Sequence, residues 1–243
     1  MLNKADLVFP DWPVPANVKS IQTTRCGGFS VAPYDTLNLG SHVQDNPVIV
    51  AQNRQLLSRY LPSEPVWLNQ VHGVEVVDAS QCACTPDADA SFTHQKEVVC
   101  VTMTADCLPI LLCDRQGTVV AAVHAGWRSL CDGVIEATVK KMQASPVDLM
   151  AWLGAAIGPQ AFEVGDEVSV AFITKDAQSD VAFTPRGDKW LGDLYLVAKQ
   201  RLANLGVHAV YGGGECTYSQ PEKYFSFRRD GVTGRMASLI WLD

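Results

Sequence analysis

The sequence predicts a single domain of mixed α and β structure. The stretch from Val98 to Arg128 reads as three β-strands in succession and then the start of a helix, and further strand-like and helix-like segments lie on both sides of it. No internal repeat, low-complexity tract or linker interrupts residues 1–243. A chain of this length can bury a substantial core as one domain. We therefore expect strands and helices that share one core.

Two turn or cap signals divide the first half of the chain. Asn46 followed by Pro47 is typical of a helix start, and apolar residues at helical spacing continue that helix to Tyr60. Gly117 ends a short polar loop of the kind that joins two hairpin strands. The strand-like runs in this half are residues 18–25, 66–71, 74–77, 98–105, 108–113 and 118–124.

The second half alternates helix and strand signals. Ser129 to Gln143 carries apolar residues on one side at helical spacing, which predicts a helix. Asp188 is the expected cap of a helix that reaches Asn204, where Gly206 stops it. A shorter helix is expected at 167–173, and strands at 150–153, 208–211 and 236–242.

Composition excludes several classes of protein. Hydrophobic residues make up 47% of the chain and charged residues 19%, as in folded globular proteins. The formal net charge of −7 argues against binding to nucleic acid or to an anionic membrane. The N-terminal stretch lacks an apolar signal-peptide core, and no run approaches the roughly 18 apolar residues of a membrane span. We therefore expect a cytoplasmic protein whose eight cysteines are mostly reduced.

The central hairpin brings a thiol towards an imidazole. If Cys113 pairs with Thr118 across the loop, the constant sum of paired positions places Cys107 directly opposite His124. Cross-strand partners have Cβ atoms roughly 4.5–5.5 Å apart. This separation suits two ligands of one metal ion, or a thiolate–imidazolium pair.

Basic residues at strand ends are candidate anion ligands. Arg25 lies at the end of a strand beside two glycines and could clamp a phosphate or a carboxylate, although it could equally be a surface residue before a turn. Arg228, Arg229 and Arg235 are concentrated around two glycines near the C-terminus. In so acidic a protein this group predicts an anion-binding rim, with a solvated hairpin loop as the alternative.

Three residues together indicate a metal site. His72, Cys107 and His124 form a His₂Cys set, which holds zinc with the fourth position left for water or substrate. A structural zinc site would have four ligands, usually in short clusters that this sequence lacks, so a metal here would be catalytic. Asp106, beside the thiol, is a candidate hydrogen-bond acceptor behind the ligands or a proton carrier.

The motifs NQVHG, MTADCLPILL, AAVHAGWR, GAAIGPQAFEVG and FSFRRDGVTGRMASLIWL, in this order, closely resemble the YfiH family. This family is also called the multicopper polyphenol oxidoreductase (laccase) family, the purine nucleoside phosphorylase family and peptidoglycan editing factor. The resemblance spans nearly the whole chain. It implies an α/β (α+β) mixed-sheet sandwich likened to cysteine hydrolases.

The resemblance also implies an activity and a site. It implies that His72, Cys107 and His124 hold zinc, and that the enzyme phosphorolyses adenosine, inosine, guanosine and methylthioadenosine and deaminates adenosine. Cys107, His124 and Asp106 are then the catalytic candidates. The partners would be small purine nucleosides and phosphate, bound to a monomer. The candidate substrate-binding residues are Arg25, Gln70 of the NQVHG motif, Arg228 and Arg229.

Three alternatives stay open at this point. A copper-dependent polyphenol oxidase with several coppers is disfavoured by a total of five histidines, although a single copper also accepts His₂Cys. A hydrolase with Cys107 as nucleophile and His124 as base would fit peptidoglycan editing, the removal of a wrong amino acid from UDP-MurNAc. A zinc-binding protein without catalytic activity is the third reading.

Overall fold

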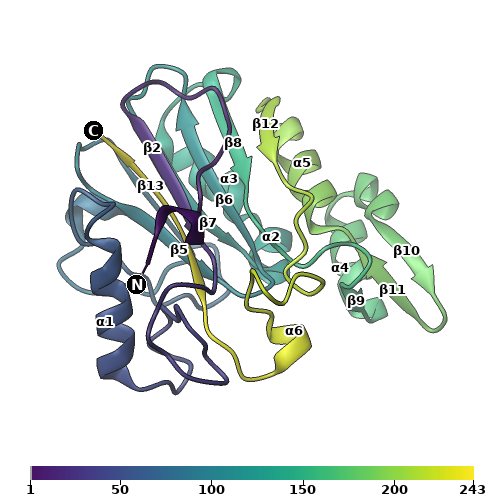
Figure 1. Ribbon diagram of the computed structural model, residues 1–243. Helices are drawn as coiled ribbons and strands as arrows, with labels where there is room; N and C mark the ends of the chain where they lie inside the picture. The colour runs from purple at the N-terminus through teal and green to yellow at the C-terminus, as the bar shows by residue number, and fades with distance from the viewer. Residues whose placement is uncertain (1) are drawn as a thin grey trace.

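The computed structural model describes residues 2–243, and these fold into two larger β-sheets stacked face to face, with a third, three-stranded sheet of order β10-β11-β9 beside them (Figure 1). Helix α1 covers the outer surface of one sheet, and helices α2, α3 and α5 lie beyond the other (Figure 1). The mixed-sheet sandwich expected from the sequence is therefore confirmed.

The smaller sheet has the strand order β1-β2-β13-β5, and every pair in it is antiparallel. The strand predicted at 236–242 is confirmed as β13, which lies between β2 and β5. Asn46 caps α1 by accepting a hydrogen bond from the backbone nitrogen of Val48, as its sequence predicts. The bounds are β1 Leu7–Val8, β2 Val18–Thr23, β5 Cys100–Thr104, β13 Met236–Leu242 and α1 Pro47–Leu57.

The larger sheet has six strands in the order β12-β8-β6-β7-β4-β3. Only the two outermost pairs, β12 with β8 and β3 with β4, are parallel. The inner pairs are antiparallel, so this sheet is mixed. The bounds are β3 Val76–Asp78, β4 Ala90–Thr93, β6 Leu108–Asp114, β7 Val120–Ala125, β8 Leu149–Leu153 and β12 Ala209–Gly212.

Strand β6 shows why the sandwich holds together. Its residues are buried on both faces: Ile110 and Leu112 pack among the helices, whereas Leu111 and Cys113 pack against the other sheet. Such a continuous apolar run is expected of a strand covered on both sides. His124 on β7 shares the face of Val120 and Ala122, so its side chain belongs between the sheets.

The register of the central hairpin differs from the prediction. Cys113 pairs with Val120 instead of Thr118, and Pro109, not Cys107, lies opposite His124. The loop is longer than expected because Asp114 accepts hydrogen bonds from the backbone nitrogens of Thr118 and Val119 and closes the turn itself. A shift of two residues keeps the same side chains on the same face, so Cys107 still belongs to the face that carries His124.

The helix predicted at 129–143 is broken into two. Gly133 adopts φ +100°, a left-handed conformation that ends α2 and begins α3 at a new angle. The apolar periodicity continues across the break, which is why the sequence reads as one helix. The bounds are α2 Trp127–Asp132 and α3 Val134–Met142.

The helix predicted to start at Asp188 begins later. Residues 189–192 form strand β11, and Asp193 caps α5 by accepting from the backbone nitrogen of Leu196. Gly206 ends that helix, as predicted. The run at 66–71 makes only isolated bridges at Val66 and Asn69 instead of a strand. The remaining bounds are β9 Glu163–Val164, α4 Asp166–Lys175, β10 Phe183–Arg186, β11 Lys189–Gly192, α5 Leu194–Leu205, α6 Phe227–Asp230, and the 3₁₀ helices Lys4–Asp6, Ala79–Gln81, Pro146–Asp148 and Ala177–Ala182.

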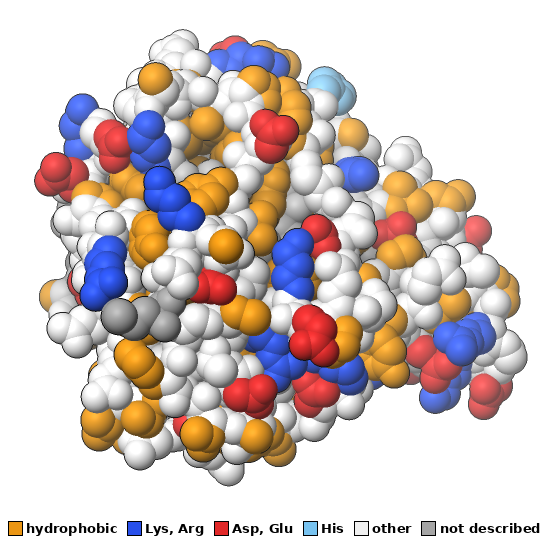
Figure 2. Space-filling model, in the orientation of Figure 1, with side chains coloured by type: hydrophobic (Ala, Val, Ile, Leu, Met, Phe, Trp, Pro, Cys, Tyr) orange, Lys and Arg blue, Asp and Glu red, His pale blue; other side chains and the backbone are white. Residues whose placement is uncertain are grey.

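The surface carries both signs of charge. On the face shown in Figure 2, Lys and Arg side chains alternate with Asp and Glu side chains, including on the projecting β10–β11 hairpin. Within residues 2–243, none of the helices has the length and hydropathy needed to cross a bilayer.

Candidate metal centre

Three side chains from separate segments converge at one end of the sandwich. His72 comes from the loop before β3, Cys107 directly precedes β6, and His124 is on β7 near its end. One potential ligand atom from each lies within 4.8 Å of the other two. The Cys107 sulfur is 3.8 Å from His72 Nε2, and the two imidazole rings meet edge to face with centroids 4.8 Å apart. The predicted trio is therefore brought together in space.

Asp89 holds the loop that carries His72. His72 has a positive φ of 60°, a conformation that non-glycine residues adopt rarely. The buried carboxylate of Asp89 accepts hydrogen bonds from the backbone nitrogens of Val71, His72 and Gly73, at 3.3, 3.0 and 2.6 Å. Three contacts from consecutive amides stabilise this unusual turn and so fix the position of the His72 ring.

The same carboxylate orients the second histidine. His124 Nδ1 lies 2.7 Å from Asp89 Oδ1, and both side chains are almost completely buried. The contact occupies Nδ1 and leaves Nε2 as the nitrogen that can bind a metal. Sequence analysis missed Asp89. The pairing of β4 with β7 would have identified it, because Ala90 pairs with Val123 and this places Asp89 opposite His124.

Asp106 plays a different part from the one expected. Its carboxylate accepts from the hydroxyl of Thr217 and from the backbone nitrogen of Arg228, both at 2.6 Å. It thus ties two C-terminal segments to the turn before β6, and its φ of +87° shows how sharp that turn is. Neither contact involves a member of the trio, whereas the Asp89 carboxylate contacts His124 directly.

The trio is electrostatically coupled. Burial alone would raise the pKa of Cys107, but the charge of His124 and hydrogen bonds with both histidines lower that pKa to about 6. Burial would lower the pKa of His124, whereas the Cys107 charge and the Asp89 hydrogen bond raise it to about 9. In the absence of a metal the favoured state near neutral pH is therefore a thiolate beside an imidazolium.

Gly126, which begins α2, forms the back wall of the site. A Cβ at this position would lie 2.9 Å from His72 Cδ2 and 3.1 Å from the Cys107 sulfur. Its backbone angles (φ −60°, ψ 157°) are accessible to any residue. Glycine is therefore needed here for space and not for conformational freedom.

The donor set fits a metal ion. Zinc–ligand bonds of about 2.0–2.3 Å in a tetrahedral arrangement place ligand atoms about 3.5 Å apart. The Cys107 sulfur and His72 Nε2 are 3.8 Å apart, and all three ligand atoms lie within 4.8 Å of one another. One thiolate, two imidazoles and a carboxylate behind one imidazole match a three-ligand zinc site with an open position. Among residues 2–243 this is the one His/Cys/Asp/Glu group whose atoms are close enough to hold an ion.

Two cavities of different character meet at Cys107 and Phe227, which line both. One, of about 290 Å³, is lined by several polar side chains and is called the polar cavity; the other, of about 130 Å³, is lined by aromatic side chains and is called the aromatic cavity. The polar cavity is lined by His42, Gln70, His72, Thr104, His124 and Arg235 among others, and the aromatic cavity by Trp127, Ile157, Phe162, Leu194 and Arg228 among others.

Gln70 lines the polar cavity, and its side-chain amide is bound to the backbone of Met103. Its amide nitrogen donates to the carbonyl of Met103 at 2.8 Å, and its amide oxygen accepts from the Met103 backbone nitrogen at 2.7 Å. The side chain is thereby held rigid at the wall. His42, also in this wall, was not singled out from the sequence as a site residue.

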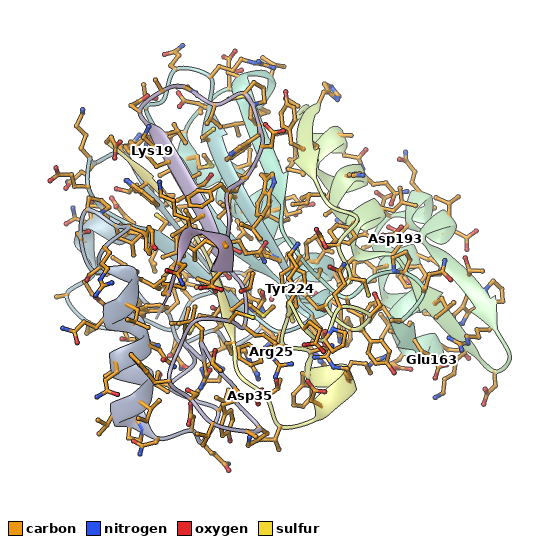
Figure 3. The ribbon with its side chains drawn as sticks, viewed as in Figure 1. Lys19, Arg25, Asp35, Glu163, Asp193 and Tyr224 are labelled. Carbon is orange, nitrogen blue, oxygen red and sulfur yellow. The ribbon has the colours of Figure 1, made fainter. Side chains whose placement is uncertain are left out.

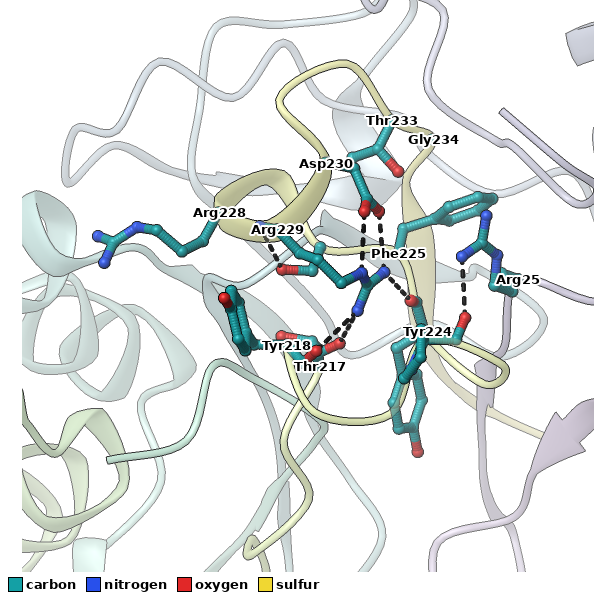
Figure 4. A network of polar contacts seen from close by, with 12 residues as sticks. Arg25, Thr217, Tyr218, Tyr224, Phe225, Arg228, Arg229, Asp230, Thr233 and Gly234 are labelled. Carbon is teal, nitrogen blue, oxygen red and sulfur yellow. Dashed lines mark hydrogen bonds and ion pairs between the residues drawn. The ribbon is translucent and has the colours of Figure 1, made fainter. Parts of the chain in front are cut away.

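Arg25 and Arg229 are occupied by the protein itself. Arg25 donates to the carbonyls of Asp35 and Pro221 and pairs with the Asp35 carboxylate, and Figure 3 shows it side by side with that residue. Arg229 donates to Asp230 and to three backbone carbonyls, as the dashed lines in Figure 4 show. Their contacts support a structural role for both and give no support to phosphate binding.

Arg228 extends away from Arg229 (Figure 4). Its guanidinium donates to the carbonyl of Glu163 and lies 5.6 Å from the centre of the Phe162 ring. It therefore lines the aromatic cavity, on the opposite side of Cys107 from Arg235.

Residues 19–243 match the family model described as multi-copper polyphenol oxidoreductase laccase. The chain belongs to this family. The resemblance to YfiH proteins expected from the motifs is thus confirmed. A solved structure of a Neisseria meningitidis protein assigned to family DUF152 superposes with a TM-score of 0.95 at 50% identity, covering 98% of this chain and 99% of that one.

Other proteins similar to this chain carry different names. A protein of Shigella flexneri named purine nucleoside phosphorylase YfiH is 54% identical over 97% of this chain and 98% of its own length. A Pseudomonas aeruginosa protein named purine nucleoside phosphorylase is 52% identical over 96% of this chain and 97% of its own. The structure of YlmD from Geobacillus stearothermophilus is more distant, with 28% identity and a TM-score of 0.88 over 93% of this chain and 92% of that one.

Proposed function

We propose that this protein is a zinc-dependent enzyme of purine nucleosides, which phosphorolyses adenosine, inosine, guanosine and methylthioadenosine and deaminates adenosine. The observation that carries the proposal is the convergence of His72, Cys107 and His124 between a polar and an aromatic cavity. The names of relatives more than 50% identical over nearly the whole chain support the phosphorolysis.

The metal ligands are His72, Cys107 and His124, with Asp89 orienting the last. Zinc bound by three protein ligands supplies Lewis-acid catalysis and activation of water. The buried Asp89 carboxylate keeps the His124 Nε2 facing the site, and Gly126 leaves room for His72 and Cys107 to approach each other.

The two cavities suit the two halves of a nucleoside. The flat faces of Phe162, Phe227 and Trp127 can stack on a purine base and exclude water from it. The polar cavity, with Gln70 in its wall, then receives the ribose and the second substrate. For phosphorolysis this orientation places the bond between base and sugar near Cys107, where the cavities meet; deamination would use a different orientation of the base.

Both proposed reactions balance without a redox partner. In phosphorolysis an oxygen of hydrogen phosphate bonds to the anomeric carbon as the glycosidic C–N bond breaks, the bonding electrons go to the purine nitrogen, and the phosphate proton ends on that nitrogen. In deamination an oxygen of water bonds to the purine carbon that carries the amino group, and ammonia leaves.

The test combines metal analysis with product analysis. The purified protein should contain about one zinc per chain and convert inosine plus phosphate into hypoxanthine and ribose 1-phosphate. Removal of the metal by a chelator should abolish turnover, and added zinc should restore it. A zinc-loaded protein that turns over none of the four nucleosides would refute the proposal.

A second candidate is a cysteine hydrolase that edits a peptidoglycan precursor by removing a wrong amino acid from UDP-MurNAc. It is favoured by the lowered pKa of Cys107 and by the Cys107–His124–Asp89 arrangement, which has the form of nucleophile, base and orienting acid. Such a hydrolase would keep its activity after chelation and lose it on alkylation of Cys107.

Copper is the alternative metal, because His₂Cys also serves as the equatorial set of single-copper sites. Several coppers held mainly by imidazoles are hard to reconcile with five histidines in the chain. Copper in place of zinc, together with oxidation of phenols, would favour polyphenol oxidase activity over nucleoside chemistry.

A further inference from the structure

We infer that Arg235 is the residue that binds the inorganic phosphate in the polar cavity. The inference rests on the proposed phosphorolysis, which needs an anion held beside the metal centre. Arg235 shares the polar cavity with all three members of the trio. Its guanidinium brings a permanent positive charge to this cavity.

Arg235 offers an unoccupied edge of its guanidinium. Nη1 donates to the carbonyls of Thr233 and Gly234, both at 3.0 Å. Nε and Nη2 make no hydrogen bond to any residue in the described part of the chain. These two nitrogens form the edge that binds two oxygens of a phosphate side by side.

The guanidinium of Arg235 also makes no ion pair with a carboxylate, although the more distant charges of Cys107 and Asp106 act on it. Among residues 2–243, no carboxylate lies within ion-pair distance of this guanidinium. A partly buried charge without a partner is costly, so a fold that retains one indicates a ligand of opposite charge. The other arginine beneath this cavity, Arg54, uses both Nε and Nη2 on the Leu39 carbonyl and stacks on Trp67.

The position of Arg235 is fixed before any ligand arrives. Its backbone nitrogen donates to Asn38 Oδ1 at 2.9 Å, and its carbonyl accepts from the Leu39 nitrogen at 3.2 Å. Gly40 makes room for the side chain, because a Cβ there would lie 2.8 Å from Arg235 Cγ. The loop at residues 38–40 therefore sets where the open edge lies.

The test measures the phosphate dependence of inosine phosphorolysis by the zinc-loaded enzyme. Arg235→Gln should raise the KM for phosphate about 10- to 100-fold, the loss expected for two hydrogen bonds to a charged group, with a much smaller change in the KM for inosine. Arg235→Lys should fall in between, because it keeps the charge and loses the paired donors. Adenosine deamination, which uses no phosphate, should be largely retained in both variants.

Two further variants separate the anion site from general damage. Gly40→Ala, which pushes on the Arg235 side chain without removing it, should raise the same KM. Arg59→Gln, at an exposed arginine, is the matched control and should change neither activity. A folded Arg235→Gln enzyme with an unaltered KM for phosphate would overturn the inference, as would an equal loss of phosphorolysis and deamination.

Direct binding of inorganic phosphate distinguishes failure of this inference from failure of the proposed function. If the wild-type enzyme forms no ribose 1-phosphate, the proposed phosphorolysis is wrong. Binding of phosphate measured by calorimetry on the zinc-loaded protein, present in wild type and lost in Arg235→Gln, would then still support an anion site at Arg235. Absence of phosphate binding in the wild type, or equal binding in the variant, would refute it.

Discussion

Replacement of Asp89 by Asn tests whether one carboxylate positions two of the three proposed metal ligands. Asp89 accepts from three consecutive backbone nitrogens around His72 and from His124 Nδ1. An asparagine of the same shape has one acceptor oxygen, and the N–H groups of its amide would face the N–H groups that now donate to Asp89. The variant should therefore loosen both histidines at once.

The expected magnitude follows from those four contacts. Loss of a residue that orients a metal ligand typically weakens metal binding by about 10- to 100-fold. At least two of the four donors would lose their acceptor. A hydrogen bond to a charged group contributes about 1.5 kcal/mol or more, so the free energy of unfolding should fall by about 3 kcal/mol. Both effects should appear in the same variant.

The assay is zinc affinity by competition with a chelator, together with urea unfolding of the metal-free protein. Asp87→Asn is the matched control, because Asp87 lies two residues away, is exposed and accepts from the Asn69 amide. A folded Asp89→Asn protein whose zinc affinity stays within about twofold of wild type would refute the assigned role of Asp89.

Three further perturbations have defined outcomes. Gly126→Ala should weaken zinc binding by about 10-fold or more and retain the fold, because the new Cβ crowds the Cys107 sulfur. Gly73→Ala is the control in the same chelator competition, because its Cβ would have no neighbour nearer than 3.6 Å. In the metal-free protein, the rate of Cys107 alkylation should rise with pH around a midpoint of about 6 instead of about 8.5, because the thiolate is protonated below its lowered pKa. A midpoint above pH 8 would contradict the coupling to His124. Asp106→Ala should lower the free energy of unfolding by about 1–3 kcal/mol and leave zinc affinity almost unchanged, and a large loss of zinc affinity would restore Asp106 as a residue behind the ligands.

Much of the fold could be predicted because the local sequence patterns agree with the burial of side chains in the tertiary structure. The apolar run of β13 and the Asn46–Pro47 start of α1 were located from the sequence because burial and capping act on adjacent residues. The break at Gly133 was missed because the apolar face continues through it. The start of α5 was misplaced because Asp188 and Asp193 are equally good caps, and only the pairing of β11 with β9 and β10 selects the second.

The three proposed metal ligands were selected from the sequence by their chemistry and not by strand pairing. The expected register was wrong by two residues, yet Cys107 and His124 still share a face because side chains alternate along a strand. Asp89 was missed because its partners come from two other segments, and no local pattern reveals that. The unpaired edge of the Arg235 guanidinium could not be predicted either. The sequence groups Arg235 with Arg228 and Arg229, but the three guanidinium groups make different contacts in the fold.

The place of β13 has a consequence for biosynthesis. Strands β2 and β5 are translated early but never touch as partners, because the strand that joins them comes more than a hundred residues later. In a growing polypeptide that has reached Gly234, strands β2 and β5 still lack the strand that pairs with both. Arg235 is the residue directly before that strand. The smaller sheet can therefore be completed only after this C-terminal segment has been translated.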